Sequence, residues 1–136
     1  MVFDLSSWKQ SFEIVSQELE LARRKKQALD DLLSTGRVSR PTYEHLEKGL
    51  TGTMRDLETQ LRSHAERMTD RAEELEKQTQ LLELLLAKLE IHHAAEEIDD
   101  GTYGKQRDAV ELGLAATKNE LNQIRNSLMK VAAKPA

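Results

Sequence analysis

The segments GRVSRPTYE (residues 36–44) and EEIDDGTYG (residues 96–104) decide the fold of this chain, because they repeat one design sixty residues apart. In both, an apolar residue precedes a capping residue, and a threonine and a tyrosine follow. Ser39 and Asp99 are the capping residues, because short polar side chains accept hydrogen bonds from the free backbone amides at a helix start. Each segment therefore predicts a corner at which a new helix begins.

The residues around each cap predict how the corner is packed. Val38 and Tyr43 flank the first cap in the two positions of a hydrophobic staple, and Ile98 and Tyr103 flank the second cap in the same way. The two corners should therefore be built by the same contacts.

The two corners differ in the residue that ends the preceding helix. Gly36 predicts a stop, since glycine readily adopts the left-handed conformation that closes a helix. The second corner has Glu96 at the matching position. We expect either backbone strain at Glu96 or a different entry into that corner.

Outside the corners, apolar residues step by four and three, which is the spacing of a helical seam. No proline interrupts the chain between Pro41 and Pro135, so very long helices are allowed. The pattern predicts an all-α coiled-coil protein. The expected elements are helices at about 7–35, 40–96 and 100–131, a disordered tail at 132–136, and a single domain over 1–136. The seam of the central helix is predicted to consist of Leu46, Leu50, Met54, Leu57, Leu61, Ala65, Met68, Ala72, Leu75, Thr79, Leu82, Leu86 and Leu89.

Short corners make consecutive helices antiparallel neighbours. We therefore predict two antiparallel helical hairpins that share one long central helix. Counting back from the corners sets Leu19 opposite Leu57 in the first hairpin and Ile124 near Leu75 in the second. The junction predicted at the middle of the central helix consists of Trp8, Met68 and Val131.

The stretch LLELLLAKLEI at residues 81–91 is apolar around most of its helical circumference. One antiparallel neighbour covers about two positions in seven, so it cannot bury all of these side chains. Such a patch is unusual on a monomer, which favours a homo-oligomer. The alternative is that an outer helix bends over the patch within one chain. The candidate self-association patch consists of Leu81, Leu84, Leu85 and Ile91.

Composition and charge limit the classes of function. The chain has no cysteine, which excludes disulfides and thiolate chemistry. Its net charge of -4 argues against the broad basic surface of a nonspecific nucleic-acid binder. The basic run RRKK at residues 23–26 spreads around its helix, so a solvated role is favoured over contact with a membrane surface or DNA. The start MVFDLSSW has no signal-peptide pattern, and no long apolar run occurs, so we expect a cytoplasmic protein.

The sequence offers few candidates for chemistry. His92 and His93 precede the second corner beside several carboxylates, but adjacent side chains point to different sides of a helix, so we expect no metal site. Carboxylate pairs such as Glu73 and Glu74 lie on a convex surface without a pocket that would shift a pKa. No phosphate-binding loop or nucleophile elbow is present. We expect no enzymatic activity, no cofactor and no small-molecule substrate.

Nearly the whole chain, roughly from Trp8 to Leu128, resembles a known family, the coiled-coil region of CdvA, the archaeal cell-division protein of the ESCRT-III-linked Cdv system. The residues that carry the resemblance in the first hairpin are Trp8, Arg24, Ala28, Leu29, Leu32, Val38, Ser39, Thr42, Tyr43 and Glu44. The second corner, with Ile98 and Tyr103, is similar to the matching later segment of the family. Better-known members carry an N-terminal PRC-type β-barrel and a C-terminal peptide that recruits the ESCRT-III-like partner CdvB, and we expect neither here. The resemblance implies the polymerising, scaffold-forming middle of CdvA, at the division site or the membrane periphery.

Three hypotheses of function follow. The leading one is a structural protein that self-assembles and scaffolds division or membrane remodelling. The second is a coiled-coil adaptor or chaperone-like module, whose apolar patch around Leu84 receives a different protein. The third and weakest is a peripheral membrane binder that uses the basic run at residues 23–26.

Overall fold

The computed structural model describes residues 5–132, and these form three α-helices and no strand. The helices are α1 (Leu5–Ser34), α2 (Arg40–Ala94) and α3 (Asp100–Ala132). Their ends lie within two residues of the predicted bounds. Of the predicted tail, the part beyond Ala132 lies outside the described residues. Within the described range, no helix is both long and apolar enough to cross a membrane.

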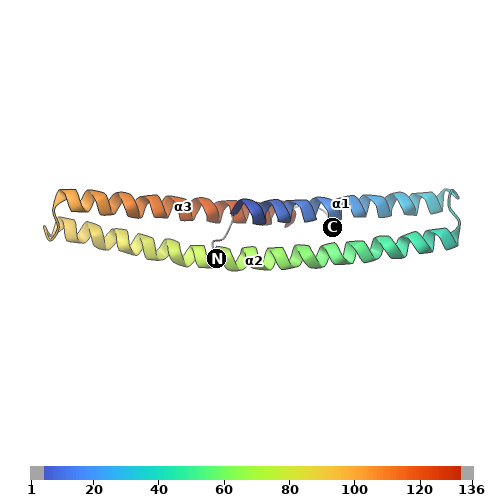
Figure 1. Cartoon of the computed structure of the whole chain (residues 1–136), viewed down its shortest axis with the longest axis horizontal. Helices are drawn as coiled ribbons and strands as arrows, with labels where there is room; N and C mark the ends of the chain where they lie inside the picture. The colour runs from blue at the N-terminus through green and yellow to red at the C-terminus, as the bar shows by residue number, and fades with distance from the viewer. Residues whose placement is uncertain (1–4, 133–136) are drawn as a thin grey trace. The chain divides into compact units, whose positions relative to one another are not determined.

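The helices form the predicted pair of antiparallel hairpins around a shared central helix. α1 lies alongside the first part of α2, and α3 lies alongside its later part (Figure 1). By its contacts the chain divides into two compact units, Met1–Arg67 and Met68–Ala136. The first unit contains the α1–α2 hairpin, and the second contains the α2–α3 hairpin.

The core of the first unit is a cluster of aliphatic side chains from both helices. Val15, Leu19 and Ala22 of α1 are buried together with Leu57 of α2. Leu19 and Leu57 therefore share one core, as the predicted register of this hairpin requires. Each fully buried leucine contributes about 1.5 to 3 kcal/mol to folding. Met54 and Leu61 pack against the same cluster.

The seam of α2 differs from the prediction near the first corner. Leu46 was expected in the seam, but its side chain is 46% exposed. Glu47 takes the place instead, and its carboxylate lies 3.6 Å from Nζ of Lys26 on α1. Lys26 is itself a seam residue, so a carboxylate satisfies it better than an aliphatic side chain. With Glu47 in the seam, the steps from Tyr43 to Leu50 alternate four and three, so the placement of Leu46 in the seam was wrong.

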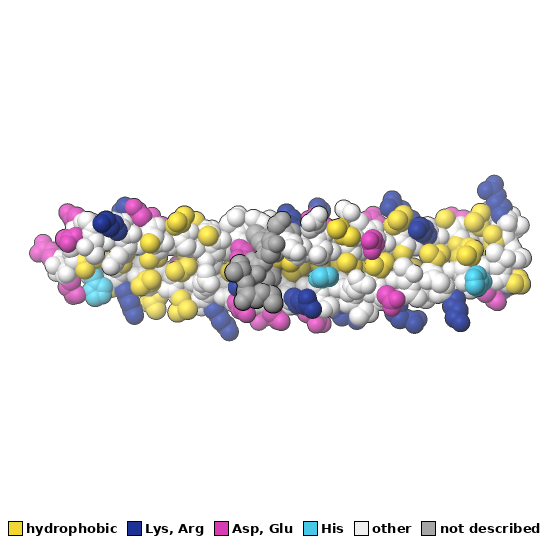
Figure 2. Space-filling model, in the orientation of Figure 1, with side chains coloured by type: hydrophobic (Ala, Val, Ile, Leu, Met, Phe, Trp, Pro, Cys, Tyr) yellow, Lys and Arg dark blue, Asp and Glu magenta, His cyan; other side chains and the backbone are white. Residues whose placement is uncertain are grey.

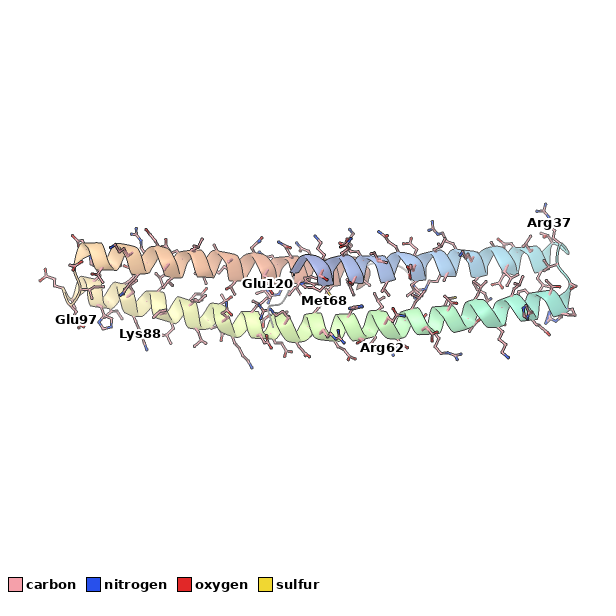
Figure 3. The ribbon with its side chains drawn as sticks, in the orientation of Figure 1. Arg37, Arg62, Met68, Lys88, Glu97 and Glu120 are labelled. Atoms are coloured by element: carbon pink, nitrogen blue, oxygen red, sulfur yellow. The ribbon has the colours of Figure 1, made fainter. Side chains whose placement is uncertain are left out.

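The core of the second unit consists of buried side chains from both α2 and α3, and Figure 3 labels one of them, Met68. Leu75 and Ile124, which the predicted register sets near each other, are 1% and 0% exposed. Met68 is also buried, and Val131 is half-buried. Trp8 belongs to the first unit and is half-buried. The meeting of Trp8 with Met68 and Val131 stays a prediction.

Ion pairs run along both edges of the second hairpin. On one edge, Arg71 Nε donates to Glu120 Oε2 at 2.7 Å. The Glu120 carboxylate raises the pKa of Arg71 above its ordinary value, so the guanidinium stays charged. The pairs on the other edge are Glu76 with Arg125 and Glu83 with Lys118. These ion pairs show which side of α2 and which side of α3 lie on the same edge of the hairpin.

Candidate functional site

The two corners close their helices with the same backbone pattern. At the first corner, Arg37 N donates to Leu32 O at 2.9 Å and Gly36 N donates to Leu33 O at 3.1 Å. This pair of bonds is a Schellman motif, which requires a left-handed residue just after the helix. Gly36 is that residue, with φ of 75°.

The second corner repeats the motif without a glycine. Glu97 N donates to His92 O at 2.9 Å, and Glu96 N donates to His93 O at 3.0 Å. Glu96 has φ of 62° and is the one residue other than glycine with positive φ among the described residues. Of the two possibilities left open by the sequence, the structure has the strained one.

A capping residue starts the helix after each corner. The backbone N–H of Thr42 donates to Ser39 Oγ at 3.4 Å, and that of Thr102 donates to Asp99 Oδ1 at 2.7 Å. The hydrogen bond from the Thr102 backbone is the largest cause that lowers the pKa of Asp99. This cap is therefore a carboxylate at neutral pH, and its negative charge interacts favourably with the positive end of the helix dipole.

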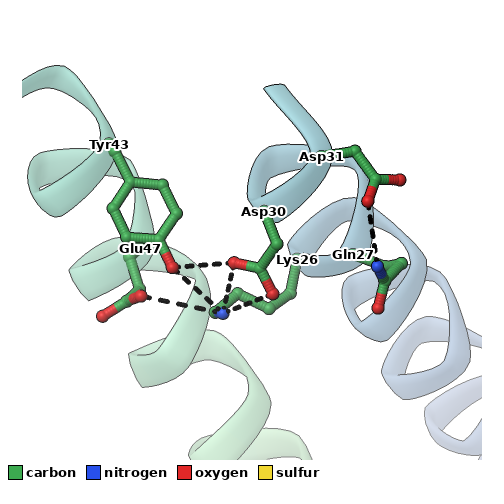
Figure 4. Close-up of polar contacts among 6 residues, drawn as sticks. All are labelled: Lys26, Gln27, Asp30, Asp31, Tyr43 and Glu47. Atoms are coloured by element: carbon green, nitrogen blue, oxygen red, sulfur yellow. Dashed lines mark hydrogen bonds and ion pairs between the residues drawn. The ribbon is translucent and has the colours of Figure 1, made fainter. Parts of the chain in front are cut away.

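The first tyrosine lies in a polar cluster between α1 and α2 (Figure 4). Tyr43 Oη donates to Asp30 Oδ1 at 2.7 Å, and Lys26 Nζ donates to the same carboxylate. The carboxylates of Glu47 and Asp30 favour the neutral phenol and raise the pKa of Tyr43 to about 12. Val38 is half-buried, and its staple with Tyr43 stays a prediction.

The second tyrosine makes the equivalent contact. Tyr103 Oη donates to Glu90, which lies thirteen residues before it, as Asp30 lies before Tyr43. The ring of Tyr103 stacks on His93 at 3.8 Å between centroids, and the guanidinium of Arg107 lies 5.3 Å from its centre. Ile98 is half-buried, and its staple also stays a prediction.

The histidines of this corner pair with carboxylates rather than gathering around one point. His92 Nδ1 lies 2.7 Å from Glu97, and His93 Nε2 lies 2.8 Å from Asp100. Residues 5–132 contain no group of three or more His, Asp or Glu side chains that could hold a metal ion. The absence of a metal or cofactor in the working protein stays a prediction.

The basic run at residues 23–26 is divided by the fold. Arg23 pairs with Glu58 at 3.7 Å, and Lys26 pairs with Asp30 and Glu47 in the polar cluster. Arg24 and Lys25 are exposed. Two of the four cations therefore pair with carboxylates of the first hairpin and do not contribute to a one-sided basic patch.

The candidate self-association patch is exposed in the second unit. Its members, with their exposed fractions, are Leu81 (66%), Leu84 (53%), Leu85 (49%) and Ile91 (65%). The seam of α2 is occupied by other leucines, such as Leu89 at 7%. Figure 2 shows hydrophobic side chains gathered on the surface formed by the end of α2 and the start of α3. No outer helix covers the patch within this unit.

The structure divides the patch between two sides of α2. Leu85 follows Arg71 by two heptads, so it lies on the edge where Arg71 pairs with Glu120. Leu81 lies one turn before Leu85 on the same side. Leu84 and Ile91 are one heptad apart and point away from α3, because the seam residues occupy the opposite side of the helix.

The family model for the CdvA-like coiled-coil domain matches residues 7–135. The chain belongs to the CdvA-like coiled-coil family. This match spans both hairpins, both corners and the patch. Among curated proteins, the chain is similar to Cell division protein A of Sulfolobus acidocaldarius, with 25% identity over 130 residues. The matched region covers 93% of this chain and 53% of that relative, so the chain spans about half the length of the relative. No solved structure matches.

The corners that suggested the CdvA-like family carry features that the sequence did not single out. Asp30 and Glu90 stand thirteen residues before the two tyrosines. That equal spacing could have predicted both contacts from the sequence, because both corners turn the chain through the same number of residues. Arg107 had no such signal, since the matching residue of the first corner is the carboxylate Glu47.

Proposed function

We propose that this chain is a non-enzymatic structural protein that self-associates through its coiled coil and acts as a scaffold in CdvA-type cell division. Membership of the CdvA-like family and the likeness to a cell division protein support the division role. The observation that carries self-association is the exposure of four large aliphatic side chains on the end of α2.

The energetics of these side chains favour assembly. Fully burying an exposed leucine is worth about 1.5 to 3 kcal/mol, so two such side chains on one side of α2, buried on both copies, supply several kcal/mol before the entropic cost of association. An unpartnered patch of this kind marks a binding surface more often than a free one. The partners proposed are a second copy and an ESCRT-III-like protein of the CdvB type. The place of action proposed is the division site.

Sedimentation and electron microscopy of the purified chain test this function. Dimers, larger assemblies or filaments, formed by a chain that stays helical, are the expected result. A stable monomer that binds a different protein through the patch would replace this proposal with the adaptor or chaperone-like function. Pelleting with liposomes in the absence of assembly would favour the peripheral membrane binder.

A further inference from the structure

One side of the α2–α3 hairpin combines exposed leucines with very small residues. Leu81 and Leu85 lie on this side of α2, on the edge marked by the pair of Arg71 with Glu120. On α3, the residue one heptad before Glu120 is a glycine, and alanines stand three and four residues from that glycine. The residues of this apolar face are Leu81, Leu85, Ala109, Gly113 and Ala116.

Charges are sparse on the apolar face and dense on the opposite edge. Between Gln78 and His92 on this side of α2, Lys88 is the sole formal charge, and the matching stretch of α3 has none. The opposite edge contains the ion pairs of Glu76 and Glu83 with α3. A partner therefore desolvates little charge on the apolar face and much on the other edge.

The leucines and the small residues stand at matching heights along the hairpin. Gln78 bonds to Thr117, and the side chain of Leu82 is the nearest to Gly113. The helices are antiparallel, so moving one residue forward along α2 corresponds to moving one residue back along α3. To within one residue, Leu81 therefore lies at the height of Gly113, and Leu85 at the height of Ala109. The face therefore presents projecting leucine side chains on α2 and a low stretch of very small residues on α3, which we call the small-residue groove.

The hairpin itself does not require the glycine of this groove. A Cβ at Gly113 would lie 3.9 Å from Leu82 Cδ1, which is an ordinary contact, and its φ is not positive. A glycine inside a helix costs roughly 0.5 to 1 kcal/mol relative to alanine. Close approach of another chain would explain a glycine at this position, whereas the packing of the isolated hairpin does not.

We propose that the apolar face binds the same face of a second copy, about a two-fold axis parallel to the hairpin. This arrangement places α2 of one copy over α3 of the other at equal heights. The leucines of each copy then enter the small-residue groove of the other, as knobs enter holes in helical bundles. The alternative two-fold axis, perpendicular to the helices, sets leucines on leucines and leaves the two grooves facing each other unfilled. This proposal rests on the proposed self-association and adds its surface and its geometry.

Adjacent positions provide matched tests of the surface. Leu84 and Leu85 are the same residue type with nearly equal exposure, 53% and 49%, yet they lie on different sides of α2. In the full chain, Leu85→Glu should lower the weight-average molar mass measured by light scattering at micromolar concentration, because it places a carboxylate on the contact. Leu84→Glu should leave the mass unchanged. In the same way, Ala116→Leu should fill the groove and lower the mass, whereas Ala115→Leu on the opposite edge should not.

The orientation of the two copies is tested by a distance between spin labels. The chain has no cysteine, so Glu97→Cys gives one label at the second corner of each copy. With the proposed axis both corners lie at one end, about 20 Å apart or less, given a helix diameter of 10 to 12 Å. With the perpendicular axis the labels lie about 40 Å apart, because each corner is some fourteen helical residues from the middle of the face.

The outcomes separate this inference from the function on which it rests. A wild type that is monomeric overturns both. A wild-type oligomer that is lost in Leu84→Glu but kept in Leu85→Glu overturns the apolar face and leaves self-association intact. Loss of mass in Leu85→Glu and Ala116→Leu with a label distance near 40 Å overturns the orientation. Loss of mass in those two variants alone, with a short label distance, establishes the proposal.

Discussion

Tyr43 donates a 2.7 Å hydrogen bond to Asp30, the residue thirteen positions before it, and so ties the start of α2 to the end of α1. The second corner has the same tie between Tyr103 and Glu90. Both corners thus use a Schellman end, a cap and a tyrosine that reaches back to a carboxylate. The two corners are therefore built by the same kinds of contact.

Removing one phenol hydroxyl should weaken one corner. In Tyr43→Phe the ring stays, but the Asp30 carboxylate loses a donor, so we expect a lower melting temperature. Tyr103→Phe should act in the same direction through Glu90. Thermal unfolding followed by circular dichroism measures both changes, and unchanged melting in both variants would remove the account of the corners.

The ionisation of Tyr43 should lower the stability of the first corner at high pH. Its pKa is raised to about 12, whereas a free tyrosine titrates near 10. A raised pKa contributes stability that is fully present below pH 10 and is lost as pH rises from 10 to 12. Absorbance titration in Tyr103→Phe isolates this phenol, and Glu47→Gln should lower its midpoint. A midpoint near 10 while the helicity is intact would contradict the polar cluster.

Replacing the strained residue of the second corner by glycine should make the chain more stable. Glu96 has φ of 62° where the first corner has Gly36. A left-handed non-glycine residue costs about 1 to 2 kcal/mol, so Glu96→Gly should stabilise the chain by about 1 kcal/mol. Gly36→Glu, the reverse change at the matching position, should destabilise it. Chemical denaturation measures both, and a destabilised Glu96→Gly would mean that the Glu96 side chain contributes more than its backbone costs.

The sequence predicted the helices, the two corners and the antiparallel pairing, because spacing, caps and glycine are local signals. It placed Leu46 in the seam, since apolar pattern alone does not show that Lys26 needs Glu47 as a partner. The positive φ of Glu96 was left open, because only the closed corner imposes it. The division of the leucine patch between two sides of α2 required the hairpin register, which edge pairs such as Arg71 with Glu120 supply.

Buried and exposed leucines should respond differently to truncation. Leu75 is 1% exposed in the core of the second unit, so Leu75→Ala should cost about 2 to 5 kcal/mol. Leu112 is 75% exposed on α3, so Leu112→Ala should change stability by no more than about 0.5 kcal/mol. Urea denaturation compares the two, and equal costs would contradict the assignment of the core.

Self-association is the central claim, and the molar mass of the full chain tests it most directly. Light scattering at micromolar concentration should give at least twice the chain mass of 15.5 kDa. The double variant Leu84→Glu/Leu85→Glu should stay helical by circular dichroism and fall to the monomer mass. A wild type that is already monomeric at that concentration would contradict the claim and the scaffold function built on it.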